Sequence, residues 1–159
     1  MSERWRTPEE VFNPLNEEFC FDLDVAADEE LASISTYSKD SLNLADWPGR
    51  TIWCNPPYGR KLELFVRRCA IEAMKDETKI VVALIPLRCR AAWWHEAVIG
   101  KAVEVRCVRK RIKFKRPDGT RGKYTGSCDS CIVIWHGKGN GETVLKSFKQ
   151  REPREGRNG

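Results

Sequence analysis

The chain has 159 residues, the length of a single domain, and its hydrophobic content of 41% argues against disorder over most of that length. No apolar run approaches the roughly 18 residues that a membrane span needs, and the N-terminus has no signal-peptide core, so we expect a cytoplasmic protein with no membrane partner. The net charge of +5 is modest, which leaves its distribution along the chain as the informative property.

Seven cysteines stand at scattered positions. An odd number without regular spacing is typical of reduced thiols, several of which lie in apolar runs where cysteine acts as a small hydrophobe. Cys128 and Cys131 have the spacing of half a zinc site, but no second pair of ligands follows nearby. We therefore expect no metal site.

The first predicted element is a helix that begins near Thr7-Pro8-Glu9-Glu10. Thr7 is expected as the N-cap, Pro8 at the first helical position, and Glu10 as the second half of a capping box. The apolar face of this helix would consist of Val11, Phe12 and Leu15. The unpaired N–H groups at such a helix start can bind a carboxylate.

A short apolar run over residues 19–27 contains Asp22 and Asp24, two residues apart. In a strand both acids would face the same side, and at the carboxyl end of the first strand of an open α/β sheet they would meet a ligand in the crevice there. The alternative is a pair of exposed acids on an edge strand. A helical turn at 28–31 and a weak strand at 33–37 would follow.

The next strand, Thr51–Cys54, ends abruptly in Asn55-Pro56-Pro57-Tyr58. The two prolines have no N–H, so the carbonyls of Asn55 and Pro56 become rigid acceptors, and the Asn55 side chain adds another. Acceptors of this kind suit an amino group on an aromatic ring, because two accepted hydrogen bonds localise its lone pair for attack. Tyr58 could stack on that ring. The alternative is a Pro-Pro turn capped by a packed tyrosine.

Helices and strands alternate after this turn, which is typical of an α/β fold. Apolar residues at helical spacing predict a helix over 62–75 that packs on a sheet. The run Lys79–Leu87, which contains Pro86, predicts a strand buried on both faces. A second helix over 91–99, with His95 on its surface, and strands at 103–107 and 131–135 would complete the fold.

The positive charge is concentrated between residues 109 and 123. Eight basic residues stand there against one acid, Asp118, although the whole chain has a net charge of only +5. Pro117-Asp118-Gly119 is a turn signal, so we expect a basic β-hairpin that binds phosphates, with Phe114 and Tyr124 placed to stack on an unpaired base. A solvated surface hairpin is the alternative. The basic residues are Arg109, Lys110, Arg111, Lys113, Lys115, Arg116, Arg121 and Lys123.

The last part of the chain is predicted to be less ordered. Gly137, Gly139 and Gly141 follow the last expected strand and are interpreted as a flexible exit, because no helix with dinucleotide spacing follows them. The domain would span residues 1–148. Residues 149–159, rich in charge, glycine and proline, would form a disordered tail.

The turn at Asn55–Tyr58 is similar to the catalytic motif of amino-group methyltransferases that use S-adenosylmethionine. With its surroundings it resembles the phage DNA N6-adenine methyltransferases, a Dam-like family. The resemblance implies a single-domain, class-I Rossmann-like α/β fold with a mostly parallel sheet. It also implies S-adenosylmethionine as cofactor, double-stranded DNA as substrate with the target adenine flipped out, and a phage or prophage protein in a bacterial cytoplasm.

The resemblance also assigns roles to individual residues. Asn55, Pro56, Pro57 and Tyr58 would be catalytic. Thr7 and Pro8 resemble a Thr-Pro motif that holds the methionine end of the cofactor, and Asp22 and Asp24 resemble its first acidic motif. The glycine-rich turn of the broader class is absent, since Ala26-Ala27 stand in its place. In similar enzymes an aspartate at about the distance of Asp40 from Asn55 accepts a hydrogen bond from the cofactor's adenine. Asp40 fits that position better than Asp46, although either could be a loop acid.

Two kinds of alternative function remain open. The same four-residue motif serves enzymes that methylate RNA adenine, cytosine N4 or a protein glutamine, and the basic segment disfavours the protein substrate. The other alternative is a DNA-binding protein that keeps the fold and has lost the cofactor, which would explain the missing glycine-rich turn.

Overall fold

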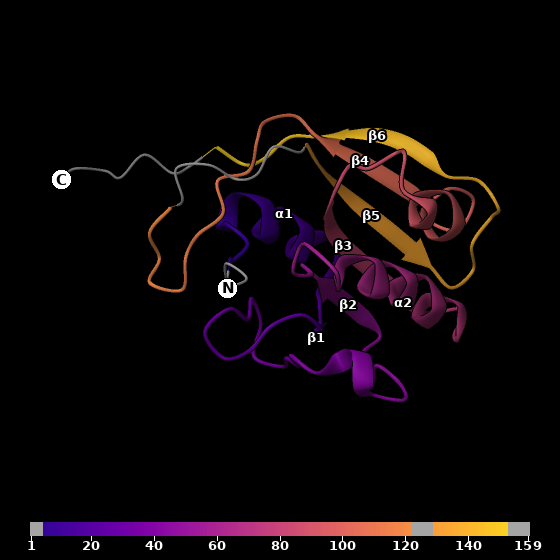
Figure 1. Cartoon of the computed structure of the whole chain (residues 1–159), viewed down its shortest axis with the longest axis horizontal. Helices are drawn as coiled ribbons and strands as arrows, with labels where there is room; N and C mark the ends of the chain where they lie inside the picture. Colours follow the sequence, from indigo (N-terminus) through magenta and orange to yellow (C-terminus); the bar gives the residue numbers. More distant parts are fainter. Residues whose placement is uncertain (1–4, 122–128, 153–159) are drawn as a thin grey trace.

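The computed structural model describes residues 5–121 and 129–152, in which six strands form one sheet in the order β1-β2-β3-β5-β4-β6 (Figure 1). Strands β1, β2 and β3 are mutually parallel, and β4 is parallel to β6. Strand β5 lies antiparallel between β3 and β4, so the sheet is mixed, with five strands in one direction. The strands are Leu23–Asp24, Thr51–Cys54, Ile80–Pro86, Glu104–Val108, Ser130–His136 and Val144–Phe148.

Helical elements cover both faces of this sheet. The helical elements are the helices α1 (Glu9–Phe19) and α2 (Leu62–Met74), a short 3₁₀ helix η1 (Ser41–Asn43) and a π-helix η2 (Trp94–Val98). Strand β3 shows the two faces by alternation: Val81, Ala83 and Ile85 pack in one core, and Val82 and Leu84 pack in the other. The architecture is therefore a three-layer α/β/α sandwich.

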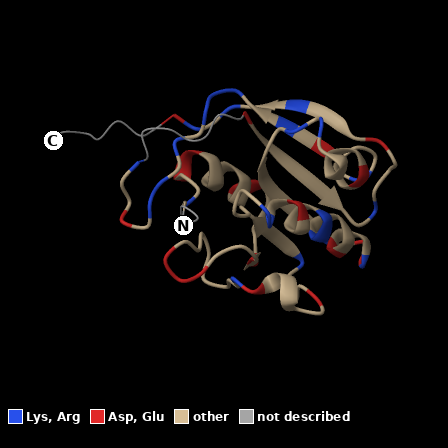
Figure 2. Ribbon diagram, in the orientation of Figure 1, with Lys and Arg blue, Asp and Glu red and all other residues tan. Residues whose placement is uncertain are grey.

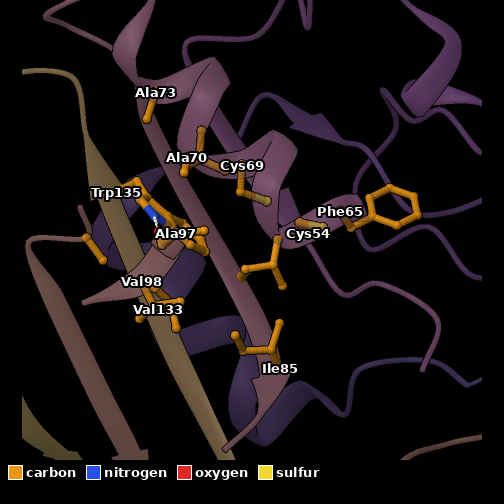
Figure 3. Packing of buried hydrophobic residues seen from close by; sticks show 14 of the residues in the cluster. Cys54, Phe65, Cys69, Ala70, Ala73, Ile85, Ala97, Val98, Val133 and Trp135 are labelled. Carbon is orange, nitrogen blue, oxygen red and sulfur yellow. Dashed lines mark hydrogen bonds between the residues drawn. The ribbon is translucent and has the colours of Figure 1, made fainter. Parts of the chain in front are cut away.

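The first core lies between the sheet and the pair α2 and η2. Figure 3 shows Cys69, Ala70 and Ala73 of α2 gathered against Trp135 of β5. The Trp135 indole N–H donates to the carbonyl oxygen of Ala97 over 2.7 Å, so its one polar atom is satisfied inside the core. The predicted helix over 62–75 is confirmed, because its apolar spacing matches this buried face.

The second core lies under α1, which begins one residue later than expected. Val11 and Leu15 are fully buried against the sheet. Pro8 is the N-cap residue and no side chain caps the helix, so the predicted Thr7 cap and capping box are wrong. The physical reason is competition: the Thr7 hydroxyl accepts a hydrogen bond from Asn55, and the Glu10 carboxylate pairs with Arg121.

The basic segment contains the turn of the predicted hairpin, closed by an antiparallel bridge between Lys115 and Arg121, and the returning arm expected from Tyr124 lies outside the described residues. Residues 109–121 run irregularly past α1, and Lys115 forms isolated bridges to Arg6 and to Arg121. Ile112 and Phe114 are buried in the second core. Their alternation with basic residues therefore reflects an extended segment packed beside α1. Lys123 and Tyr124 lie outside the described residues.

The chain returns to the sheet after β5 instead of leaving it. Gly137, Gly139 and Gly141 belong to the connection to β6, an edge strand that the sequence did not predict. A Cβ at Gly137 would lie 1.8 Å from the carbonyl oxygen of Asp76, so only glycine fits there. Beyond β6, Arg151 pairs with Glu17 of α1 at 2.6 Å, so the described start of the predicted tail contacts the domain.

The predicted second helix is present, but most of it is of the π type. Residues 92–98 are helical, with Trp94–Val98 as the π-helix, and Gly100 follows at a φ of 77°. The His95 ring lies 2.7 Å from the carbonyl oxygen of Cys89, on the protein surface. Among the described helices, none combines the length and apolar character required to cross a bilayer.

Candidate active site

A cavity of about 980 Å³ lies where β1 and β2 end. Because these strands are parallel, their carboxyl ends meet at one edge of the sheet, and the segments that follow them form facing walls. The turn after β2 supplies Asn55, Pro56, Pro57 and Tyr58. The other wall comes from residues after β1 and around η1, namely Ala26, Ala27, Asp28, Leu31, Lys39, Asp40, Leu42 and Asn43.

Aromatic rings surround one end of this cavity. Tyr58 is 39% exposed, and its ring centroid lies 6.3 Å from that of the buried Phe114, with the planes at 86°. Trp5 also lines the cavity, and Arg116 lies over its ring at 5.8 Å. Apolar rings of this kind bind a flat aromatic ligand by stacking and edge contacts.

The Asn55 side chain is held at the cavity wall by a residue 48 positions earlier in the chain. Its Nδ2 donates a hydrogen bond to Thr7 Oγ1 over 2.9 Å. Across the described part of the chain, the Asn55 side-chain oxygen accepts no hydrogen bond. That oxygen is therefore available to an N–H donor in the cavity. Thr7 is only 6% exposed, and neither it nor Pro8 is among the cavity-lining residues.

Asp24 supports a wall of the cavity without lining it. Its carboxylate accepts hydrogen bonds from the backbone N–H groups of Ala26, at 3.3 Å, and Ser33, at 3.1 Å. The side chain is 2% exposed, and this burial raises the pKa of Asp24 to about 6, although the two N–H donors oppose the rise. The carboxylate thus fastens the segment after β1, where the glycine-rich turn is missing.

Asp22 lies at the other end of the strands. Its carboxylate accepts hydrogen bonds from the backbone N–H groups of Arg50, at 3.0 Å, and Thr51, at 3.2 Å, where β2 begins. The cavity lies at the opposite, carboxyl end, and Asp22 does not line it. The geometry does not support the predicted cofactor contact of Asp22, which instead stabilises the start of β2.

Asp40 and Asp46 have different surroundings. Asp40 lines the cavity directly before η1, and its carbonyl oxygen accepts the N–H of Asn43 at 3.0 Å. Asp46 lies outside the lining residues and pairs with Lys75 at 2.8 Å. The preference for Asp40 therefore agrees with the geometry. Asp28 is a further cavity acid that sequence analysis missed, since a turn after a strand gave no functional signal.

A buried ion network anchors the wall that contains η1. Glu72 of α2 is 0% exposed and pairs with Arg68, Lys75 and Lys79 at 2.7, 2.8 and 3.1 Å. Burial alone would raise the pKa of Glu72, but the hydrogen bonds from these cations lower it to about 2. Arg68 also donates to the carbonyl oxygen of Leu44 at 2.6 Å. The network thus ties the segment after η1 to α2.

Figure 2 shows where basic and acidic residues lie along the chain, and the predicted DNA-binding residues among them differ in their acidic partners. Arg121 pairs with Glu10, Lys115 lies 4.0 Å from Glu9, and Lys110 lies 3.8 Å from Glu152. Within residues 5–121 and 129–152, no acidic partner is found for the exposed side chains of Arg109, Arg111 and Lys113.

The cavity also has features that sequence analysis did not anticipate. The outer face of α2 contributes Lys61, Leu64, Arg67, Arg68 and Ile71 to its lining. Leu64 and Ile71 are each 55% exposed, and their position on the polar side of a helix was the signal that could have identified them. No group of three or more histidine, cysteine or acidic side chains that could hold a metal occurs among the described residues.

The residues that line the cavity are suited to two groups: a positively charged ligand that contains a nucleoside, and an amine on an aromatic ring. The cavity is at the upper end of the range for small-molecule sites, roughly 300–1,000 Å³. Carboxylates of Asp28 and Asp40 suit a positively charged ligand and hydroxyl or amino donors, and Leu31 and Leu42 provide apolar contacts. Asn55 and the aromatic rings lie at the other end.

Comparison with known proteins places these features in a family context. A family model described as DNA N-6-adenine-methyltransferase (Dam) matches residues 1–157. The chain is also similar to a DNA N-6-adenine-methyltransferase of Haemophilus phage HP1 (strain HP1c1), with 31% identity over 114 residues. The match covers 69% of this chain and 65% of the relative, which is slightly less than two thirds of the relative's length.

Proposed function

Because the chain belongs to the family of DNA N-6-adenine-methyltransferases (Dam), we propose that it transfers a methyl group from S-adenosylmethionine to the N6 amino group of adenine in double-stranded DNA. The observation that carries the proposal is the position of Asn55-Pro56-Pro57-Tyr58 in the wall of a cavity of about 980 Å³ at the carboxyl ends of β1 and β2. In open α/β sheets, ligands bind at this edge.

The wall that contains Asp28 and Asp40 is the proposed cofactor side. S-adenosylmethionine supplies a methyl group on a positively charged sulfur, together with an adenosine moiety. Asp40 would accept a hydrogen bond from the adenosine moiety, and Leu42 beside it would pack on the purine ring. Asp24 acts on this side indirectly, by holding Ala26 and Ser33 in place.

The end with the aromatic rings is the proposed site of the target adenine. An adenine inside a duplex cannot reach the cavity, so it must leave the stack at a cost of a few kcal/mol. Tyr58 would stack on the flipped base, with Phe114 at the edge. The Asn55 side-chain oxygen and the Pro56 carbonyl oxygen would accept the two N6 hydrogens and direct the nitrogen lone pair toward the methyl group. Positioning then provides most of the catalysis.

The basic segment next to this end is the proposed contact with the DNA backbone. Arg109, Arg111 and Lys113 are exposed and are therefore the cations most available to phosphates. Lys110, Lys115, Arg116 and Arg121 would add charge, although contacts within the protein engage them. The phage origin of the relative is consistent with action in a bacterial cytoplasm.

The test is the transfer of a labelled methyl group from S-adenosylmethionine to unmethylated duplex DNA, followed by separation of the product nucleosides. We expect the label in N6-methyladenine. Label in N4-methylcytosine would replace the proposed base with the other nucleic-acid amine that this motif serves. Cofactor binding without label in DNA would lead to RNA or protein as the substrate, and failure to bind the cofactor would favour a DNA-binding protein that is not an enzyme.

A further inference from the structure

The side chain of Thr7 is the only one in the described part of the chain that bonds the Asn55 amide. Its hydroxyl oxygen lies 2.9 Å from Asn55 Nδ2, although the two residues are 48 positions apart. Thr7 is 6% exposed and does not line the cavity. Its hydroxyl also caps no helix, since α1 has no side-chain cap. We therefore assign to this buried hydroxyl the role of binding the Asn55 side chain.

This contact holds the Asn55 side chain at the cavity wall, with the Thr7 hydroxyl accepting from Nδ2 in the structure; a hydroxyl can also donate, so the contact anchors the amide without selecting its orientation. An asparagine amide has a donor half and an acceptor half, which a rotation of 180° exchanges. A target amine that presents N–H groups needs the side-chain oxygen of Asn55. The NH₂ group of Asn55 in that place would face the amine with a second donor, and no hydrogen bond could form. With Nδ2 bonded to Thr7, the side-chain oxygen remains for the cavity.

We infer that Thr7 is a positioning residue that anchors the Asn55 side chain at the cavity wall, within reach of the target amine. This inference rests on the proposed function and replaces the cofactor contact that the sequence resemblance implied for Thr7. It concerns an effect on the rate of transfer, whereas a cofactor contact would act on cofactor affinity.

The segment that contains Thr7 is itself held firmly from both sides. Arg6, directly before it, exchanges two backbone hydrogen bonds with Lys115, at 2.6 and 3.0 Å. The Arg6 guanidinium donates to the carbonyl oxygen of Ala32 at 3.2 Å. Directly after it, the carbonyl oxygen of Pro8 accepts hydrogen bonds from the backbone N–H groups of Val11 and Phe12 in α1. A fixed backbone lets one hydroxyl hold the Asn55 side chain in place.

The test compares Thr7→Val, which keeps the shape and removes the hydroxyl, with Thr7→Ser, which keeps the hydroxyl. At saturating cofactor and DNA, we expect Thr7→Val to slow single-turnover methyl transfer by about 10- to 100-fold, the effect of losing one positioning hydrogen bond. Cofactor affinity should change by less than about twofold, since the bond lies outside the cavity. Thr7→Ser should restore most of the rate. Thr78→Val, which removes a surface hydroxyl bonded to Asp76, is the matched control.

A second readout does not depend on catalysis. The side-chain amide signal of Asn55, assigned by its loss in Asn55→Ala, should shift and exchange faster with water in Thr7→Val, and Thr7→Ser should reverse both changes. An unchanged signal would overturn the inference, as would a Thr7→Val variant that loses cofactor affinity but keeps its rate at saturation. Failure of the proposed function looks different: the wild-type protein would transfer no methyl to DNA, while the amide signal still responded to Thr7→Val.

Discussion

Asn55 contributes to the proposed reaction mainly through one atom, its side-chain oxygen. We expect Asn55→Ala to lower the rate of methyl transfer by at least about 100-fold, since it removes an acceptor aimed at the reacting amine. Affinity for S-adenosylmethionine should remain close to that of the wild type. Rate measurements at saturating cofactor, with equilibrium binding alongside, check both parts.

The matched control for this prediction is Asn140→Ala. Asn140 also uses its side-chain oxygen as an acceptor, from the N–H of Glu142, but it lies on the surface in the β5–β6 connection. Its removal should leave transfer unchanged. Near-normal transfer by Asn55→Ala would show that Asn55 does not carry the chemistry.

The buried carboxyl of Asp24 makes stability depend on pH. Its folded-state pKa of about 6 exceeds the unfolded value of 3.8 because burial disfavours the charge. The folded state then binds the proton more tightly, so the free energy of unfolding decreases as pH rises from 3.8 to 6. The size of this decrease is about 3 kcal/mol.

Denaturation of the wild type and of Asp24→Asn at several pH values measures this effect. The stability of the wild type relative to the variant should fall through that pH window and stay constant above it. A difference between the two proteins that is independent of pH would mean that Asp24 titrates normally.

At the scale of elements, the ion network of Glu72 fastens α2 to the wall of the cavity. Glu72→Gln would leave the ammonium of Lys79 buried without its carboxylate, and we expect a loss of about 3–5 kcal/mol in the free energy of unfolding. The control is Glu77→Gln. Glu77 is exposed in the turn between α2 and β3, so its substitution should have little effect on the free energy of unfolding.

The pH dependence gives this prediction a second check. Because the pKa of Glu72 is lowered from 4.5 to about 2, its contribution is present above pH 4.5 and disappears as pH falls toward 2. The deficit of Glu72→Gln should therefore shrink in acid. A constant deficit over this range would point to lost packing instead of lost charge.

Some cations of the basic segment have acidic partners within the protein, and others have none among the described residues and are free to contact phosphates. We expect the double variant Arg111→Ala with Lys113→Ala to weaken binding to all DNA sequences and to reduce the slope of log affinity against log salt by about two. The matched control is Lys101→Ala with Lys138→Ala, an exposed pair elsewhere on the molecule. A salt slope that is unchanged by the first pair would remove this segment from the DNA interface.

The sequence predicted elements where local pattern and tertiary environment agree. Strands at 51–54, 80–86, 104–108 and 130–136 and helix α2 follow apolar runs or helical spacing that their buried positions require. Strand β6 was missed because Val144 and Leu145 are exposed on the edge of the sheet and Phe148 is its only buried residue, so the strand shows no alternation of buried and exposed positions. The turn of the predicted hairpin is present, with an antiparallel bridge between Lys115 and Arg121, whereas the burial of Ile112 and Phe114 beside α1 had no local signal.

Contacts between distant segments were beyond sequence reasoning. The turn Asn55–Tyr58 could be singled out because its residues are contiguous, and Asp40 because the family resemblance implies an aspartate at about its distance from that turn; the roles of both stay predictions. The bond from Asn55 to Thr7 and the roles of Asp22 and Asp24 depend on which end of the sheet each side chain reaches. A single sequence contains no local signal of that placement.

At the scale of the whole molecule, the first twenty residues join three regions that are far apart in sequence. Thr7 bonds Asn55, Glu10 pairs with Arg121 and Glu17 pairs with Arg151. The inner face of α1 packs with Ile112 and residues of β5 and β6. The N-terminal segment is therefore the element on which the second core and the cavity wall both depend.

This dependence has a consequence for the order in which the proposed active site forms during synthesis of the chain. Helix α1 leaves the ribosome first, yet Ile112, Ile132 and Phe148, which bury its face, leave more than ninety residues later. Closing such long loops is slow compared with forming local helices and turns. Until those late residues arrive, α1 has no complete core to pack on and Thr7 is not held beside Asn55, so the proposed methyl transfer would have to wait for the end of the chain.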